Sequence, residues 1–175
     1  MKYGYKPKRL KCWDYTTPWW YFITICTKNH INYFGEVKNG KMIPNRYGNI
    51  ADSLWQQIPE HHLEVEIDEY VIMPNHIHGI IIINERKNVA CNVSTTDNFH
   101  SNISPKPGSL SAIVRSFKSA VSKQIHTIGN NNFHWQSRFY DRIIRNEREL
   151  FQIRKYIQQN PLKFEIEHDI ENLDI

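Results

Sequence analysis

Two histidines stand two residues apart in the stretch YVIMPNHIHGIIII, residues 70–83, which otherwise predicts a buried strand. Side chains at i and i+2 of a strand point to the same face, so His76 and His78 project together. Unpaired buried imidazoles are costly, and two adjacent protonated ones repel each other. A divalent cation accepts both as neutral ligands. The pair therefore predicts either a metal site or two hydrogen-bonded structural histidines.

A second group of polar residues lies in the stretch RKYIQQNP, residues 154–161. Tyr156 and Asn160 are four residues apart, so on a helix they share a face. That face differs from the apolar stripe that begins at Leu150. If the helix crosses the sheet, Asn160 brings an amide oxygen to the metal and Tyr156 a hydroxyl beside it. Taken singly, Tyr156 is better explained as a packing residue, and Asn160 as the helix end before Pro161.

An antiparallel sheet and a helix must bring these residues together, and the chain predicts both. Alternating or continuous apolar runs predict strands, apolar residues at helical spacing predict helices, and Asn39-Gly40 is a hairpin turn signal. Consecutive strands joined tightly at Pro74-Asn75 imply antiparallel pairing. We therefore expect an α+β fold, an antiparallel sheet with packed helices. The expected elements are a strand over 19–28, a hairpin over 33–43, a helix over 49–58 ended by Pro59, strands over 63–73 and 76–83, a helix over 109–125, a strand over 138–145, and a helix from Asn146 that Pro161 stops.

The length of 175 residues predicts one domain over 1–175. Within it we expect a basic N-terminal arm over 1–18, a mobile polar loop over 85–108 and an acidic tail over 162–175. Three widely spaced cysteines without a CxxC pair argue against a disulfide framework and a thiolate zinc site, and favour a reducing cytosol. No signal-peptide pattern opens the chain, and the longest apolar run is too short to cross a bilayer. We therefore expect a cytoplasmic protein without a membrane partner.

Taken together, these strings resemble the single-tyrosine HUH transposases, named for a histidine, a hydrophobic residue and a histidine, as in His76-Ile77-His78. YFITICTKN and YFGEV resemble the first hairpin of that family. SLSAIVRSFKSAVSKQI and WQSRFYDRIIRNERELFQIRKYIQQNP resemble its second half, so the resemblance runs through most of the chain. The pair Trp135-Gln136 and the YIQQNP ending are more similar to the REP-associated tyrosine transposases than to the transposases of short insertion sequences.

The resemblance implies a ferredoxin- or RRM-like HUH fold and a DNA transposase activity. It implies that Tyr156 attacks a phosphodiester of single-stranded DNA, forms a 5′-phosphotyrosine and frees a 3′ hydroxyl. It makes His76, His78 and Asn160 ligands of Mg²⁺ or Mn²⁺, although ligand type alone leaves zinc as an alternative. The implied partner is single-stranded or hairpin DNA at the nucleoid. Both a homodimer with the tyrosine helix in trans and a monomer are compatible with the resemblance.

Positive side chains are the expected contacts to DNA phosphates. The basic arm also carries Tyr3 and Tyr5, which suit base stacking. Solvated charge on amphipathic elements is an equal explanation for the basic residues outside the arm. The predicted DNA-binding residues are Arg9, Arg115, Lys118, Arg138 and Arg142, with Arg145 as a further candidate.

Two other functions compete with a tyrosine transposase. One is a catalytically silent module of the same fold that binds single-stranded nucleic acid. It is disfavoured because His76, His78, Tyr156 and Asn160 are all present, and no strand resembles the GFGFVxF pattern of RNA-recognition domains. The other is a metal hydrolase that uses water, for which a Tyr156→Phe variant keeps its activity.

Overall fold

The structure, a computed structural model, describes residues 13–85 and 105–173. Arg9 and most of the predicted arm and loop lie outside the described residues. Four strands form an antiparallel sheet in the order β4-β5-β1-β6, and β2 and β3 form a separate hairpin. The elements are β1 Trp19–Cys26, a 3₁₀ turn Lys28–His30, β2 Gly35–Lys38, β3 Lys41–Pro44, α1 Arg46–Gln56, α2 Ile58–His61, β4 Val65–Ile72, β5 His76–Ile83, α3 Leu110–Thr127, β6 Tyr140–Ile143 and α4 Glu147–Leu173. The predicted α+β fold is confirmed.

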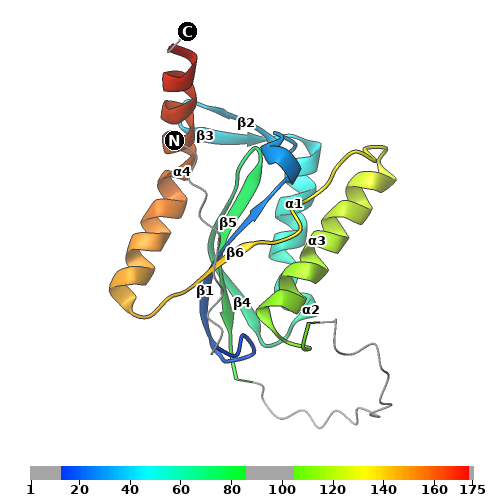
Figure 1. Cartoon of the computed structure of the whole chain (residues 1–175), viewed down its shortest axis with the longest axis vertical. Helices are drawn as coiled ribbons and strands as arrows, with labels where there is room; N and C mark the ends of the chain where they lie inside the picture. Colours follow the sequence, from blue (N-terminus) through cyan, green and yellow to red (C-terminus); the bar gives the residue numbers. More distant parts are fainter. Residues whose placement is uncertain (1–12, 86–104, 174–175) are drawn as a thin grey trace.

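Helices cover both faces of the sheet, with α1 and α3 on one side and α4 on the other (Figure 1). The alternation of side chains along β5 produces these two layers. Ile77 and Ile81 join the core under α1 and α3, whereas Ile80 joins the core under α4. His76 and His78 have the same parity as Ile80 and therefore face α4. The smaller core under α4 consists of Phe22, Ile80, Ile144, Leu150, Ile153 and Ile157.

The strand that carries the histidines is central, as its apolar character predicted. β5 pairs with β1 on one side and with β4 on the other, both antiparallel. Its backbone is therefore hydrogen-bonded on both edges, which makes it a rigid support for a site. Among the described helices, none combines the length and the apolar composition that a membrane span requires.

Local signals account for the ends of several elements. Asn39 and Gly40 both have positive φ, 54° and 67°, as a tight hairpin turn requires. The Ser109 hydroxyl accepts from the Ala112 amide at the start of α3. The Asn146 side chain accepts from the Glu149 amide at 2.9 Å, and the Glu149 carboxylate accepts from the Arg145 amide at 2.9 Å. The predicted capping residues therefore open α4.

Two predictions about proline are wrong. Pro59 does not end a helix: α1 ends at Gln56, and Pro59 lies in the first turn of α2. Pro161 does not stop α4, which continues to Leu173 and includes much of the predicted acidic tail. Tertiary contacts hold this second half of the helix against the β2–β3 turn. The Glu165 carboxylate accepts from the backbone amides of Asn39 at 2.8 Å and Gly40 at 2.5 Å.

A Glu165→Gln variant should therefore lose about 1 kcal/mol of unfolding free energy, because it replaces a charged acceptor of two amides by a neutral one. Amide hydrogen exchange should rise in α4 after Pro161. Chemical denaturation and exchange measured by mass spectrometry check the two effects. The matched control is Glu167→Gln, since Glu167 forms an exposed ion pair of 3.7 Å with Lys163 on the same helix. Equal stability of the two variants would contradict this account of the continued helix.

Candidate active site

His76 and His78 lie side by side on the α4-facing side of β5, with ring centroids 4.5 Å apart. Each ring is oriented by a neighbouring polar side chain. His76 Nδ1 donates to Asn75 Oδ1 at 2.7 Å, and His78 Nδ1 lies 2.8 Å from Thr24 Oγ1. Donation from His76 Nδ1 to Asn75 leaves the lone pair of His76 on Nε2, as in many metal-binding histidines, and the same tautomer of His78 would donate from Nδ1 to the Thr24 hydroxyl. Both rings therefore have the orientation that a metal ligand requires.

Burial keeps both imidazoles neutral. It lowers the pKa of His76 to about 4, although a hydrogen bond with the Asn160 side chain partly opposes the shift. Burial, the neighbouring His76 and the positive charge of Lys163 lower the pKa of His78 to about 3. At neutral pH neither ring carries a proton on both nitrogens, so no proton has to be displaced before a cation binds.

Helix α4 places Tyr156 directly on the histidine pair. Its hydroxyl lies 3.3 Å from His78 Nε2, and the two ring centroids are 5.2 Å apart. Phe22 stacks on His78 and contacts the edge of the Tyr156 ring. The Tyr156 residue is 39% exposed, so its side chain is not enclosed by the core under α4. Asn160, one turn further along α4, is buried and bonds to His76. The structure thus brings together all four residues that the sequence proposed for the centre.

A bulge in β4 holds α4 in this position. The pairing register of β4 with β5 shifts between Ile67 and Tyr70, which turns two acidic side chains toward the helix. Asp68 accepts from the Arg154 guanidinium through both carboxylate oxygens. Glu69 Oε1 accepts from Gln158 Nε2 at 3.0 Å. These contacts lie on both sides of Tyr156 along the helix and therefore determine where its hydroxyl points.

An Asp68→Asn variant should lose about 1 kcal/mol of unfolding free energy at pH 7, the usual range for a well-aligned surface ion pair. Partial burial alone would raise the pKa of Asp68, but hydrogen bonds from Arg154 and the Glu69 amide bring it below the usual 3.8. A lowered carboxyl pKa contributes stability above its unfolded value and loses it as pH falls through the folded value. The wild-type and variant stabilities should therefore converge below pH 3.8, as urea titrations between pH 7 and acid can check. A difference that stays constant with pH would contradict the ion-pair explanation.

The donor set is compatible with a divalent cation and would leave coordination positions open. Among the described residues, no group of three or more His, Cys, Asp and Glu side chains is arranged to hold a metal. A third protein ligand must then be of another type, and the buried Asn160 amide beside His76 is suitably placed. Two imidazoles and one amide oxygen leave positions free for phosphate oxygens.

The predicted DNA-binding residues fall on different sides of the molecule. Arg138 and Arg142 lie before and within β6, and the Arg142 guanidinium contacts Glu149 at 2.5 Å. Arg115 is exposed on α3, on the face of the sheet opposite to α4. Lys118 donates to the Gln136 carbonyl at 2.5 Å, and burial lowers its pKa. Their contacts with DNA stay a prediction. Arg142 pairs with Phe22 and therefore shares the α4-facing side of the sheet with Tyr156.

Sequence reasoning missed three residues of the site. Thr24 interrupts the aromatic and aliphatic run WWYFITIC, and this isolated hydroxyl was the available signal. Asn75 is adjacent to His76 and was interpreted only as part of a turn. Lys163, whose ammonium lies 5.6 Å from the Tyr156 ring centroid, gave no signal, because the helix was expected to stop before it.

The fold is similar to that of a tyrosine transposase of known structure. A REP-associated tyrosine transposase bound to a REP hairpin superposes with a TM-score of 0.56 at 19% identity, over 90% of this chain and 74% of that one. The fold implied by the sequence resemblance is therefore confirmed. No family model matches the chain. An uncharacterized protein of Haemophilus influenzae is 39% identical over 160 residues, which are 90% of this chain and 88% of that protein. The chain belongs to one family with this Haemophilus protein.

Proposed function

We propose that this protein is a metal-dependent single-strand DNA endonuclease and strand transferase, a DNA transposase of the REP-associated tyrosine type. The observation that carries the proposal is the position of the Tyr156 hydroxyl, on a partly exposed residue and 3.3 Å from Nε2 of the neutral, buried His78. The chain shares its fold with a transposase that binds a REP hairpin, which supports hairpin-containing DNA as the substrate.

The chemistry follows from the placement of the side chains. Tyr156 Oη attacks the phosphorus of a phosphodiester and loses its proton, while the bond to the 3′ oxygen breaks. The products are a 5′-phosphotyrosine and a 3′ hydroxyl that takes up a proton. A phosphotyrosine ester keeps the energy of the broken bond, so a 3′ hydroxyl can reverse the step and join strands without ATP.

His76, His78 and Asn160 would hold the divalent cation, Mg²⁺ or Mn²⁺. When bound, it supplies positive charge to the scissile phosphate and its transition state. The lone pair of His78 Nε2 is also the acceptor nearest to the Tyr156 hydroxyl. A cation held by His78 would therefore replace this hydrogen bond, and the Tyr156 hydroxyl would then be free to face the substrate phosphate. Phe22 and the contacts at Asp68 hold both rings in place.

A covalent-trapping assay tests the proposal. Purified protein is mixed with Mn²⁺ and a labelled single-stranded hairpin taken from the flanks of its own gene, and a denaturant-resistant adduct is sought on a gel. We expect an adduct with the wild type and none with Tyr156→Phe. The control is Tyr47→Phe, which removes an exposed hydroxyl on α1.

Other outcomes identify the competing functions. Cleavage without an adduct, unaffected by Tyr156→Phe, indicates a hydrolase that uses water. Binding without adduct or cleavage, across several hairpins and metals, indicates a catalytically silent binding module.

A further inference from the structure

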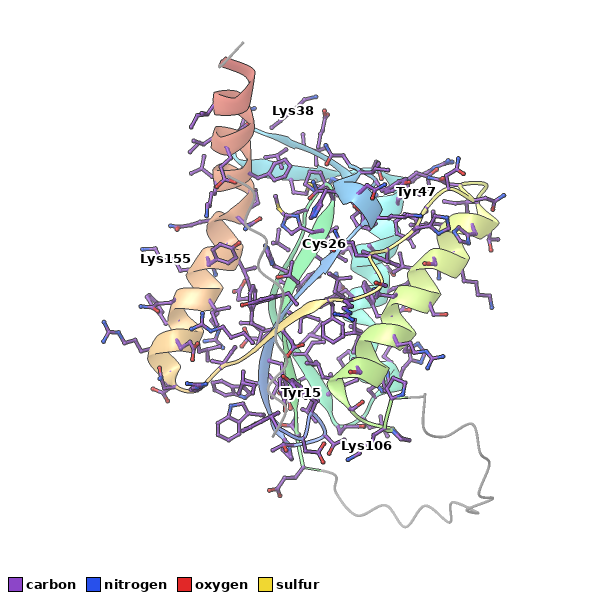
Figure 2. All side chains as sticks on the ribbon, in the orientation of Figure 1. Tyr15, Cys26, Lys38, Tyr47, Lys106 and Lys155 are labelled. Carbon is purple, nitrogen blue, oxygen red and sulfur yellow. The ribbon has the colours of Figure 1, made fainter. Side chains whose placement is uncertain are left out.

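A hollow of about 620 Å³ lies beside the outer edge of β6, next to the first turns of α4. This volume is in the usual range of ligand sites, about 300–1,000 Å³. The hollow is separate from the candidate active site, since its lining includes none of His76, His78 and Tyr156. Tyr15 lies at the end of the sheet where β1 begins (Figure 2). The residues that line the hollow include Tyr140, Arg142, Arg145, Arg148 and Gln152.

The sheet connects this hollow with the proposed nucleophile. Tyr140 pairs with Thr24, and Thr24 pairs with His78, so the three side chains form one row on the α4-facing side. The row spans about 10 Å, because neighbouring strands are about 4.8 Å apart. That distance equals about three stacked nucleotides at ~3.4 Å each. On α4, Gln152 lies one turn before Tyr156 and lines the hollow. The row of side chains on the sheet and the turn of α4 between Gln152 and Tyr156 therefore both connect the hollow with Tyr156.

The charges at this edge of the sheet favour binding of a DNA backbone. Arg142 is paired with Glu149, whose carboxylate also accepts from the Arg145 amide. The side chains of Arg145 and Arg148 are exposed, and in the part of the chain that the structure describes no ion pair occupies either guanidinium. Two arginines therefore remain to contact phosphates.

The Asp141 carboxylate also lines the hollow but does not belong to the row that runs from Tyr140 to His78. Asp141 pairs with Ile23, whose side chain is in the core under α1 and α3, so Asp141 has the parity of the opposite face. Phosphates that pass along the Tyr140 row are therefore not directed at it.

We propose that this hollow binds the unpaired nucleotides that flank the scissile phosphate in single-stranded DNA. Half-buried Tyr140 offers a ring on which a base can stack, and the Gln152 amide can bond to the edge of a base. A closed duplex exposes neither the faces nor the pairing edges of its bases well. Arg145 and Arg148 contact the phosphates on either side. The inference rests on the proposed function for the position of the scissile phosphate, but the binding site itself needs no strand cleavage.

Binding measurements test the subsite separately from the proposed strand cleavage. Fluorescence anisotropy with the Tyr156→Phe protein, in EDTA, compares three hairpins: blunt, with a short 5′ dT tail, and with a short 3′ dT tail. We expect one tail to raise affinity about tenfold, the gain typical of a stacked base. The double variant Arg145→Gln/Arg148→Gln should abolish that gain and lower the slope of log K against log salt by about 1.4, or about 0.7 for each phosphate contact to a single strand. Gln152→Ala should reduce the gain, and Arg46→Gln, an exposed arginine on α1, should leave it unchanged.

The outcomes are distinct from those of the trapping assay. A tail effect of equal size in the double variant and in Arg46→Gln overturns the inference, as does the absence of binding to every hairpin. Adduct formation without a tail effect leaves the proposed function standing and removes this subsite. If the double variant loses the tail effect and the wild type forms no adduct, the results support the subsite in a protein that only binds DNA. The tail that raises affinity identifies the flank, 5′ or 3′, that occupies the hollow.

Discussion

Replacing His78 by alanine should lower the affinity for Mn²⁺ by about 100-fold or more and abolish covalent adduct formation. His78 supplies one of two imidazoles at the site, and loss of even an orienting neighbour of a metal ligand costs about 10–100-fold. Isothermal titration with Mn²⁺ measures the affinity, and the trapping assay measures the adduct. Circular dichroism should show an unchanged fold, since β5 keeps both strand partners.

A graded series makes this prediction sharper. Thr24→Val keeps the shape of the side chain but removes the hydroxyl beside His78 Nδ1, so Mn²⁺ affinity should fall by about tenfold. His61→Ala removes a solvent-exposed histidine at the end of α2 and should change nothing. If the His78→Ala protein binds Mn²⁺ as tightly as the wild type, the cation site lies elsewhere in the chain.

The second large effect concerns Gly79, which follows His78 directly on β5. A Cβ on Gly79 would lie 2.3 Å from Cζ2 and 2.9 Å from Cη2 of the Trp55 indole, and 3.1 Å from Cβ of Tyr70. Trp55 is fully buried and packed between Tyr70 and Phe117, so it has no room to move. Gly79→Ala should therefore lose about 3 kcal/mol of unfolding free energy, the upper part of the range for an overpacked core. Urea denaturation measures the loss.

A double-mutant cycle isolates this cause. Trp55→Phe lacks the ring atoms that overlap the new Cβ. It also removes a buried indole N–H that has no hydrogen-bond partner within residues 13–85 and 105–173. In the Trp55→Phe background, Gly79→Ala should cost about 1 kcal/mol or less. An undiminished cost in that background would show that the glycine is required for its backbone rather than for space. Since β5 also carries both histidines, the single variant should bind Mn²⁺ more weakly than the wild type.

Patterns of a few residues determined the local parts of this protein. The apolar run with His76 and His78 at alternate positions predicted a central strand with both imidazoles on one face, and the structure has this arrangement. The spacing of Tyr156 and Asn160 predicted a shared helical face. Such patterns are reliable because the periods of strands and helices are set by the backbone of each segment alone.

Long-range contacts decided the rest. The bulge at Asp68 and its bond to Arg154 place α4 over its own histidines, and no local pattern in either segment indicated them. The bond from Glu165 to the hairpin turn holds the helix together beyond Pro161, where local propensity alone predicted an end. Each of these contacts joins residues more than eighty positions apart. Their formation depends on the packing of the whole sheet, so only the tertiary structure could show that a tyrosine, two histidines and an asparagine form one site.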